Sequence, residues 1–194
     1  MKNYSVEGLS RFRFLFFLAI FSSIISGYIF FLPINALSPF VSPPSAFAIF
    51  GVFLACYDKY LWRVPLFRNL SFIPCIDGNW TGVVKINEGD DLKEINVTVQ
   101  ISQTWSRINV RFVSEMTQSD CRNLSINLKN DRDVSFLWVY QVRPRDLSKV
   151  DGHGFGVTEL RSESMVDISE LQGSYFSTKM RGGSICLKKQ QQNL

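Results

Sequence analysis

The sequence predicts a two-part protein: an N-terminal two-helix transmembrane hairpin followed by an all-β domain, an antiparallel eight-stranded barrel. The first observation is that no Lys, Arg, Asp, Glu or His occurs between Phe14 and Tyr57, whereas charges are spread through the chain from Asp77 onward. The second is that the chain after Asp77 consists of short segments of alternating apolar and polar residues, separated by turn-forming clusters. A long uncharged stretch is typical of membrane spans, and alternation is typical of half-buried strands.

Two apolar stretches make up the predicted hairpin. Phe14 to Leu32 reaches the roughly 20 residues that are needed to cross about 30 Å of hydrocarbon, and Pro33-Ile34-Asn35 follows as a break. A second helix is predicted near residues 40–57, shortened at its start by Pro43-Pro44. A cleaved signal peptide is the alternative for the first stretch, but its apolar part exceeds the usual length of about 7–15 residues and a second apolar stretch follows.

The positions of the basic residues predict the orientation. Cations precede the first helix and follow the second, with none between them: Lys2, Arg11 and Arg13, then Lys59, Arg63 and Arg68. The positive-inside rule therefore places both termini and the barrel in the cytoplasm. Sequons for glycosylation, which begin at Asn69, Asn79, Asn96 and Asn123, keep an extracytoplasmic barrel open as the alternative.

The net positive charge of the chain comes from its first 74 residues, which contain the predicted membrane hairpin and linker. The first 74 residues hold six Lys or Arg and two Asp or Glu, which accounts for the whole formal net charge of +4 at pH 7. The rest is neutral overall, so we expect no nucleic-acid polymer as a partner. The predicted domains are the membrane hairpin at 1–58, an interfacial linker at 59–74, the β-barrel at 75–189 and a disordered tail at 190–194.

Strands are predicted at residues 78–87, 94–102, 105–114, 121–128, 134–142, 154–161, 171–178 and 184–188. Closing these strands into a barrel removes their unpaired edges, and no long helix is predicted to cover an open sheet. An eight-stranded barrel has an interior just large enough for side chains or one small ligand. Gly78-Asn79-Trp80 fits the Gly-x-Trp pattern that lipocalin-like barrels place at the start of their first strand, so Trp80 is the predicted plug of the barrel's closed end.

No enzyme, metal site or cofactor is predicted. The cysteines, Cys56, Cys75, Cys121 and Cys186, form no CxxC pair, and His153 is the single histidine, so a zinc site of common spacing is absent. No catalytic motif accompanies His153. The glycines around it match neither the P-loop nor the dinucleotide fingerprint, so this segment is interpreted as a hairpin turn.

The chain resembles one bacterial family over nearly its whole length. The resemblance is carried by two N-terminal apolar helices, the linker that ends in Ile73-Pro74-Cys75-Ile76-Asp77-Gly78-Asn79-Trp80-Thr81-Gly82, and the segment Leu171-Gln172-Gly173-Ser174-Tyr175-Phe176-Ser177-Thr178. The family is the two-transmembrane, β-strand-rich effectors of CBASS anti-phage systems, encoded beside CD-NTase enzymes. It implies a cytosolic barrel that senses a cyclic oligonucleotide, followed by homo-oligomerisation in the bacterial inner membrane, disruption of the bilayer and death of the infected cell.

The residues suggest where a cyclic dinucleotide would bind. Such a ligand needs aromatic faces for its bases and cations or hydroxyls for its phosphodiesters. The predicted ligand-binding residues are Trp138, Tyr140 and Tyr175 for stacking, and Arg107, Arg111, Lys179 and Arg181 for phosphate. Ordinary packing of the aromatic residues and solvation of the arginines on the outer face stay open as alternatives.

Two other functions stay open. A membrane-tethered carrier of a fatty acid or another apolar ligand would have an aliphatic interior, and an interaction domain without a small ligand would have an interior filled by side chains. Within the first helix, Ser22, Ser23 and Gly27 form a small, polar patch that could allow close contact between helices in the membrane, or packing within the hairpin itself.

Overall fold

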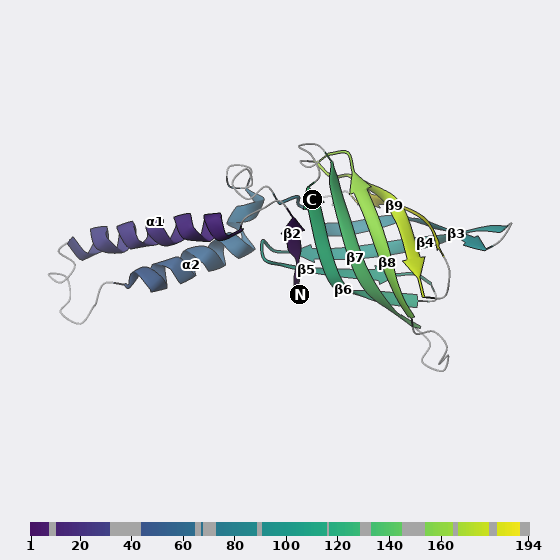
Figure 1. Ribbon diagram of the computed structural model, residues 1–194, viewed down its shortest axis with the longest axis horizontal. Helices are drawn as coiled ribbons and strands as arrows, with labels where there is room; N and C mark the ends of the chain where they lie inside the picture. Colours follow the sequence, from purple (N-terminus) through teal and green to yellow (C-terminus); the bar gives the residue numbers. More distant parts are fainter. Residues whose placement is uncertain are drawn as a thin grey trace. The chain divides into compact units, whose positions relative to one another are not determined.

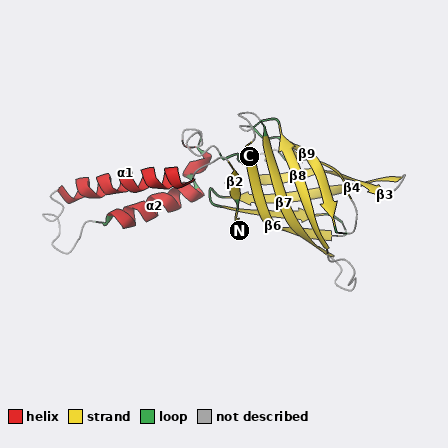
Figure 2. Cartoon of the chain, in the orientation of Figure 1, coloured by secondary structure: helices red, strands yellow, loops and turns green. Residues whose placement is uncertain are grey.

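The computed structural model describes residues 1–7, 11–31, 44–64, 67, 73–88, 91–115, 117–128, 133–144, 154–164, 167–178 and 182–190. The chain divides into two compact units, one formed by Met1–Gly8 with Pro74–Leu194 and the other by Leu9–Ile73. Among the described residues, the first unit is built of strands and the second of helices (Figures 1 and 2).

The first unit is a closed antiparallel barrel of eight strands, as the sequence predicted. The strands are β3 (Gly78–Glu88), β4 (Asp91–Gln103), β5 (Arg107–Val113), β6 (Thr117–Leu128), β7 (Val134–Pro144), β8 (Gly154–Ser162), β9 (Glu170–Ser177) and β10 (Gly182–Lys189). Each strand pairs with the next in sequence, and β10 pairs with β3 to close the ring. The largest difference from the prediction is in β6, which begins at Thr117 because its polar first residues pair with the end of β7.

One half of the barrel is a packed core. It is formed where β3, β5, β7 and β9 begin and where β4, β6, β8 and β10 end. Its buried side chains are Trp80, Val99, Ile101, Ile108, Leu124, Ile126, Val134, Phe136, Leu160, Leu171 and Leu187. Trp80 is fully buried in this half, and its Nε1–H donates to the carbonyl of Ile76 at 3.0 Å. An indole that is buried in this way contributes its large apolar area without leaving its polar atom unpaired.

Two glycines of the sequence motifs allow the strands to approach closely. A Cβ atom at Gly82 would collide with the carbonyl of Cys186 on β10, and one at Gly173 would collide with the carbonyl of Glu159 on β8. Close approach of neighbouring strands therefore explains Gly82 in the pattern Gly78-x-Trp80-x-Gly82 and Gly173 in the pattern Gly173-x-Tyr175.

The N-terminal residues form two short strands that the sequence did not predict. β1 (Lys2–Asn3) pairs antiparallel with β5, and β2 (Ser5–Glu7) pairs in parallel with β6 (Figure 1). The predicted membrane hairpin covered residues 1–58, whereas residues 1–7 belong to the same compact unit as the barrel. Segments of two and three residues carry no periodic pattern, so their pairing is determined by the strands that receive them.

The second unit contains α1 (Arg11–Phe31), α2 (Ala46–Lys59) and a short 3₁₀ helix, η2 (Leu61–Arg63). α1 and α2 pack antiparallel, with the rings of Phe14 and Tyr57 4.3 Å apart and those of Phe21 and Phe53 5.7 Å apart. Ser45 caps α2 by accepting a hydrogen bond from the N–H of Ala48 at 3.2 Å.

One helix among the described residues is long and apolar enough to cross a membrane. α1 has 21 residues and a mean hydropathy of 2.2 over its most apolar window. The 14 residues of α2 would span only about 21 Å at a helical rise of about 1.5 Å per residue. The predicted first span therefore has the required length and composition, and the predicted second span is not confirmed.

Candidate ligand-binding cavity

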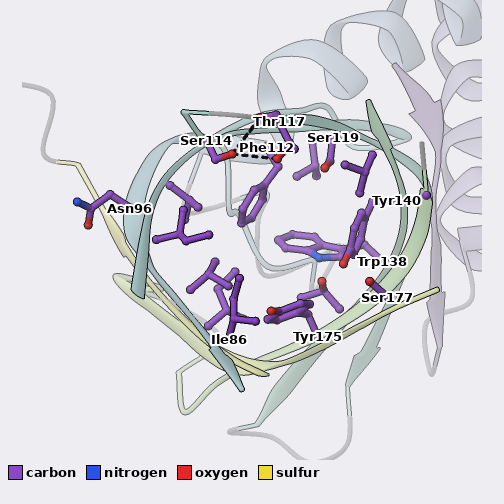
Figure 3. A pocket seen from close by; sticks show the side chains of 18 of the residues that line it. Ile86, Asn96, Phe112, Ser114, Thr117, Ser119, Trp138, Tyr140, Tyr175 and Ser177 are labelled. Atoms are coloured by element: carbon purple, nitrogen blue, oxygen red, sulfur yellow. Dashed lines mark hydrogen bonds between the residues drawn. The ribbon is translucent and has the colours of Figure 1, made fainter. Parts of the chain in front are cut away.

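The other half of the barrel contains a partly open cavity of about 500 Å³ (Figure 3). It lies where β3, β5, β7 and β9 end, at the opposite end from Trp80. All eight barrel strands contribute side chains to its wall. Its volume falls within the range of about 300–1,000 Å³ that is typical of small-molecule sites. A partly open cavity of this size is large enough for one small ligand.

Aromatic side chains form much of the wall. Trp138 and Tyr140 project into the cavity from β7, Phe112 from β5 and Tyr175 from β9 (Figure 3). The period of two explains why Trp138 and Tyr140 share this face, since alternate residues of a strand point to the same side. These rings offer flat apolar faces at several points around the space.

Gly156 makes room for the ring of Tyr140. The two residues are direct partners on β8 and β7, and a Cβ atom at Gly156 would collide with the ring carbon and hydroxyl of Tyr140. The nearest atom to a Cβ at Gly154 would be the hydroxyl oxygen of Thr178 at 3.4 Å, which is an ordinary contact. Of the two glycines at the start of β8, Gly156 therefore determines the space that is available to the ring of Tyr140.

Hydroxyl groups lie between the aromatic side chains. On β5, β6 and the turn between them are Ser114, Thr117 and Ser119, and on β8 and β9 are Thr158 and Ser177. The hydroxyls of Ser114 and Thr117 are 2.9 Å apart, and the N–H of Thr117 donates to Ser114 Oγ at 3.1 Å (Figure 3). The cavity wall therefore combines apolar surface with neutral hydrogen-bonding groups.

Two titratable side chains of the cavity wall, Tyr140 and Cys121, are neutral near pH 7. Burial, with a smaller contribution from Tyr175, raises the pKa of Tyr140 to about 12. Burial also raises the pKa of the Cys121 thiol to about 11. The charged side chains that line the cavity, Lys93, Glu94 and Glu115, are all exposed, and Glu94 forms an ion pair with Lys85 at 2.9 Å.

The structure brings three of the predicted ligand-binding residues together and separates two others from them. Trp138, Tyr140 and Tyr175 all line the cavity. Arg107 and Arg111 do not line it: they are exposed on β5, on the face opposite to Phe112. Arg111 lies 3.5 Å from the carboxylate of Asp120, its direct partner on β6.

The predicted phosphate-binding residues Lys179 and Arg181 lie outside the described residues, between β9 and β10 in the sequence. His153 and the first residues of its glycine-containing segment lie outside them as well. Within the described part of the chain, no group of three or more His, Cys, Asp or Glu is placed to hold a metal ion.

Phe112 and the hydroxyl residues were not among the predicted ligand-binding residues. A signal for Phe112 was present, because alternation put it opposite Arg107 and Arg111, and only the choice of inward face was missing. On β3, Val84 and Ile86 share the face of Trp80 by the period of two, and both line the cavity. The hydroxyl residues carried no distinct signal, because Ser and Thr are common on outer faces.

Comparison with known proteins agrees with the resemblance seen in the sequence. The profile of the family described as "Cap15, cyclic dinucleotide receptor domain" matches residues 71–189, which include every strand from β3 to β10. The chain is also similar to CD-NTase-associated protein 15 of Yersinia aleksiciae, with 24% identity over 189 residues, which cover 90% of this chain and 88% of that protein.

Proposed function

This chain belongs to the family of the Cap15 cyclic dinucleotide receptor domain, and on that premise we propose that its barrel binds a cyclic dinucleotide in the cavity beside Trp138. In this proposal the chain is the effector of a CBASS anti-phage system, and the bound second messenger is its activating signal. The observation that carries the proposal is the wall of the cavity, which combines aromatic rings with hydroxyl groups in a space of about 500 Å³.

The aromatic side chains suit the two bases of such a ligand. Stacking of a base on an aromatic side chain contributes about 1–3 kcal/mol. Trp138, Tyr175 and Phe112 lie on three different strands around the cavity, so two bases of one ligand can meet different rings.

The phosphodiesters would meet hydroxyl groups rather than the arginines that the sequence suggested. Ser114, Thr117 and Ser119 lie on one part of the wall, and Thr158 and Ser177 on another. Each hydroxyl can donate one hydrogen bond to a phosphate oxygen. Lys93 supplies a positive charge at the rim, where it is exposed.

The cavity also bears on the two alternative functions. An interaction domain with a filled interior does not account for a cavity of about 500 Å³ within the barrel. A carrier of a fatty acid needs apolar surface, which the cavity has, and hydrogen-bond donors at one place only, for the carboxylate, whereas hydroxyl groups lie on two parts of this wall. Fatty acids are therefore the competing ligands in the test below.

The output that we propose is ligand-triggered homo-oligomerisation and disruption of the bacterial inner membrane. A ligand shifts the population toward an assembled state only if it binds that state better, and a hundredfold preference is worth about 2.7 kcal/mol per protomer. α1 presents many exposed apolar side chains, among them Phe16, Phe17 and Tyr28. In the proposal, this surface contacts lipid at rest and neighbouring copies after assembly.

The small residues of α1 divide between two surfaces. Ser22 is buried, and its hydroxyl donates to the carbonyl of Leu18 at 2.7 Å. Ser23 is exposed, and open space surrounds the Cα of Gly27. We therefore assign Ser23 and Gly27 to contact between copies, because small residues let helices approach closely in membranes, and Ser22 to packing within the helix pair.

The test is thermal unfolding of the full-length protein in detergent with cyclic di- and trinucleotides and, separately, with fatty acids. A ligand at 100 times its Kd should stabilise the fold by about 2.7 kcal/mol. We expect a shift with at least one cyclic dinucleotide, its loss in Tyr175→Ala, and its retention in Arg107→Ala. A shift with fatty acids alone would replace this function by the carrier function.

A further inference from the structure

The wall of the barrel has a seam between β5 and β6. These strands pair directly over only three residues each, Arg111–Val113 with Gln118–Asp120. Beyond this short pairing the seam is occupied by the N-terminal residues: Lys2 and Asn3 pair with Ile108 and Arg107, and Ser5–Glu7 pair with Ser125–Asn127. The first seven residues therefore complete the hydrogen bonding of two strands that would otherwise present unpaired edges.

Side chains hold the N-terminal segment in this seam. Tyr4 is 4% exposed, and its hydroxyl donates to the carbonyl of Trp105 at 2.8 Å. Ser5 Oγ lies 3.0 Å from Ser125 Oγ, and Lys2 Nζ donates to the carbonyl of Arg122 at 3.3 Å.

The side-chain amide of Gln103 contacts both chain segments that lead from the barrel to the helical unit. Gln103 is 1% exposed, its Oε1 accepts from the N–H of Ile76 at 2.9 Å, and its Nε2 donates to the carbonyl of Pro74 at 3.0 Å. The same Nε2 lies 3.4 Å from the hydroxyl of Tyr4. The chain leaves the barrel after residue 7 and re-enters it at residue 74, so one buried side chain contacts both the departing and the returning segment.

The strands that hold the N-terminal segment also line the cavity. β5 contributes Val110 and Phe112, and β6 contributes Thr117, Ser119 and Cys121. These cavity residues lie at or beside the direct pairing of β5 with β6, and the residues that hold the N-terminal segment lie farther along the same two strands, so a ligand would reach that segment through β5 and β6. The N-terminal strands are the shortest in the barrel unit, with two and three residues, whereas β3–β10 have seven to thirteen. Short, edge-paired segments are the first to open, because few interactions must be broken.

We propose that residues 1–7 are an autoinhibitory strap. In the resting protein the strap fills the seam and restrains α1, which is separated from β2 by only three residues in the sequence. Ligand binding in the cavity changes the seam and releases the strap, and α1 is then free to assemble with other copies. The proposal rests on the proposed function, because the ligand that releases the strap is the cyclic dinucleotide in the cavity.

A reversible covalent lock tests the strap in the full-length protein. Ser5 and Ser125 are direct partners, with hydroxyl oxygens 3.0 Å apart, so the double variant Ser5→Cys/Ser125→Cys needs only a small adjustment to form a disulfide of about 2.0 Å. The oxidised and reduced forms are placed in proteoliposomes that contain a fluorescent dye. Binding of a cyclic dinucleotide and release of dye are measured on the same preparation.

We expect the oxidised double variant to bind the cyclic dinucleotide with a Kd within about twofold of wild type, as for a surface substitution, but to release dye only at the ligand-free rate. Addition of a reductant should restore ligand-triggered release. The single variants Ser5→Cys and Ser125→Cys, oxidised in the same way, should release dye like the wild type and so control for the native cysteines.

A second variant weakens the strap instead of locking it. Tyr4→Phe removes the hydrogen bond to Trp105, and the loss of one such bond corresponds to about a fivefold shift in the equilibrium. Ligand-free release of dye should rise about fivefold at most. Tyr60→Phe removes a hydroxyl from a side chain that is 61% exposed and should leave release unchanged.

The outcomes separate the two proposals. If the wild type binds no cyclic dinucleotide, the proposed function fails. If the ligand binds and the oxidised double variant still releases dye on ligand addition, the strap proposal is overturned. Retained binding with reversible loss of release supports it.

Discussion

The two halves of the barrel use the same residue types for opposite purposes. The closed half is the packed half around Trp80. There, the indole N–H of Trp80 donates to the carbonyl of Ile76 at 3.0 Å, and the hydroxyl of Tyr4 donates to the carbonyl of Trp105 at 2.8 Å, so main-chain carbonyls hold both rings in place. The open half is the half that contains the cavity of about 500 Å³, and Trp138 and Tyr140 face this cavity. The comparison teaches that an aromatic residue supports the fold where its surroundings are filled, and offers a binding surface where space is left beside it.

This difference predicts that stability and ligand binding can be changed separately. Burial of one large apolar side chain contributes about 1.5–3 kcal/mol. Side chains of the closed half are surrounded by other core side chains, whereas those of the open half already have free space on one side. Truncation should therefore cost stability in the closed half and ligand affinity in the open half.

The largest effect on stability is expected for Trp80→Ala. Removal of this fully buried indole should lower the free energy of unfolding by about 3–5 kcal/mol, measured by urea denaturation in detergent. Tyr175→Ala, on the wall of the cavity, should cost clearly less. Equal losses in the two variants would mean that the halves do not differ in packing.

The next effect is expected for Gly156→Ala. Its Cβ would collide with the ring of Tyr140, which can move only into the cavity or against its neighbours. We expect about 1–3 kcal/mol of destabilisation and a Kd for the cyclic dinucleotide that rises at least tenfold, an effect of about 1.4 kcal/mol. Gly51→Ala, in α2, where nothing lies within 4 Å of the added Cβ, is the matched control and should bind normally.

A smaller effect is expected from single hydroxyl groups of the cavity. Tyr175→Phe keeps the ring and removes the hydroxyl, so it should weaken binding by about 0.5–1.5 kcal/mol if that hydroxyl contacts the ligand. Arg111→Gln changes an exposed residue of the outer face and should leave the calorimetric Kd unchanged. If Arg111→Gln weakens binding more than Tyr175→Phe, the ligand lies outside the cavity.

The smallest effect on stability and binding near neutral pH is expected from the titration of Tyr140 in the cavity wall. The pKa of Tyr140 is raised from an ordinary value of about 10 to about 12, so the folded state binds more protons than the unfolded state between these values. Stability is thus fully present below about pH 10 and falls as the pH rises toward about 12. Tyr140→Phe should reduce this fall in alkaline denaturation experiments, whereas ligand affinity of the wild type should be flat from about pH 6 to 8.

The sequence predicted most of the fold because alternation is a local signal. Residues 94–102 alternate strictly, and the corresponding strand is β4. Alternation gives the relative phase of neighbouring residues but not which face is inward. Arg107 was therefore predicted to bind the ligand, whereas Phe112, on the opposite face of β5, lines the cavity.

The N-terminal strands could not be predicted for a different reason. β1 and β2 are too short for periodicity, and they exist because β5 and β6 separate after three paired residues. That separation is a property of the closed barrel and not of any local segment. The hydroxyl residues of the cavity likewise become a group only when β5, β6, β8 and β9 are brought around one space.

The central claim is that a cyclic dinucleotide binds inside the barrel, and filling the cavity tests it most directly. Ser119 points into the cavity, and Gln118, its neighbour on β6, pairs with exposed Arg143 on the outer face. Calorimetric titration of Ser119→Trp and Gln118→Trp compares the same added side chain on the two faces of one strand. The account predicts that Ser119→Trp folds but no longer binds the cyclic dinucleotide, while Gln118→Trp binds like the wild type. Unchanged binding by a folded Ser119→Trp protein would contradict it.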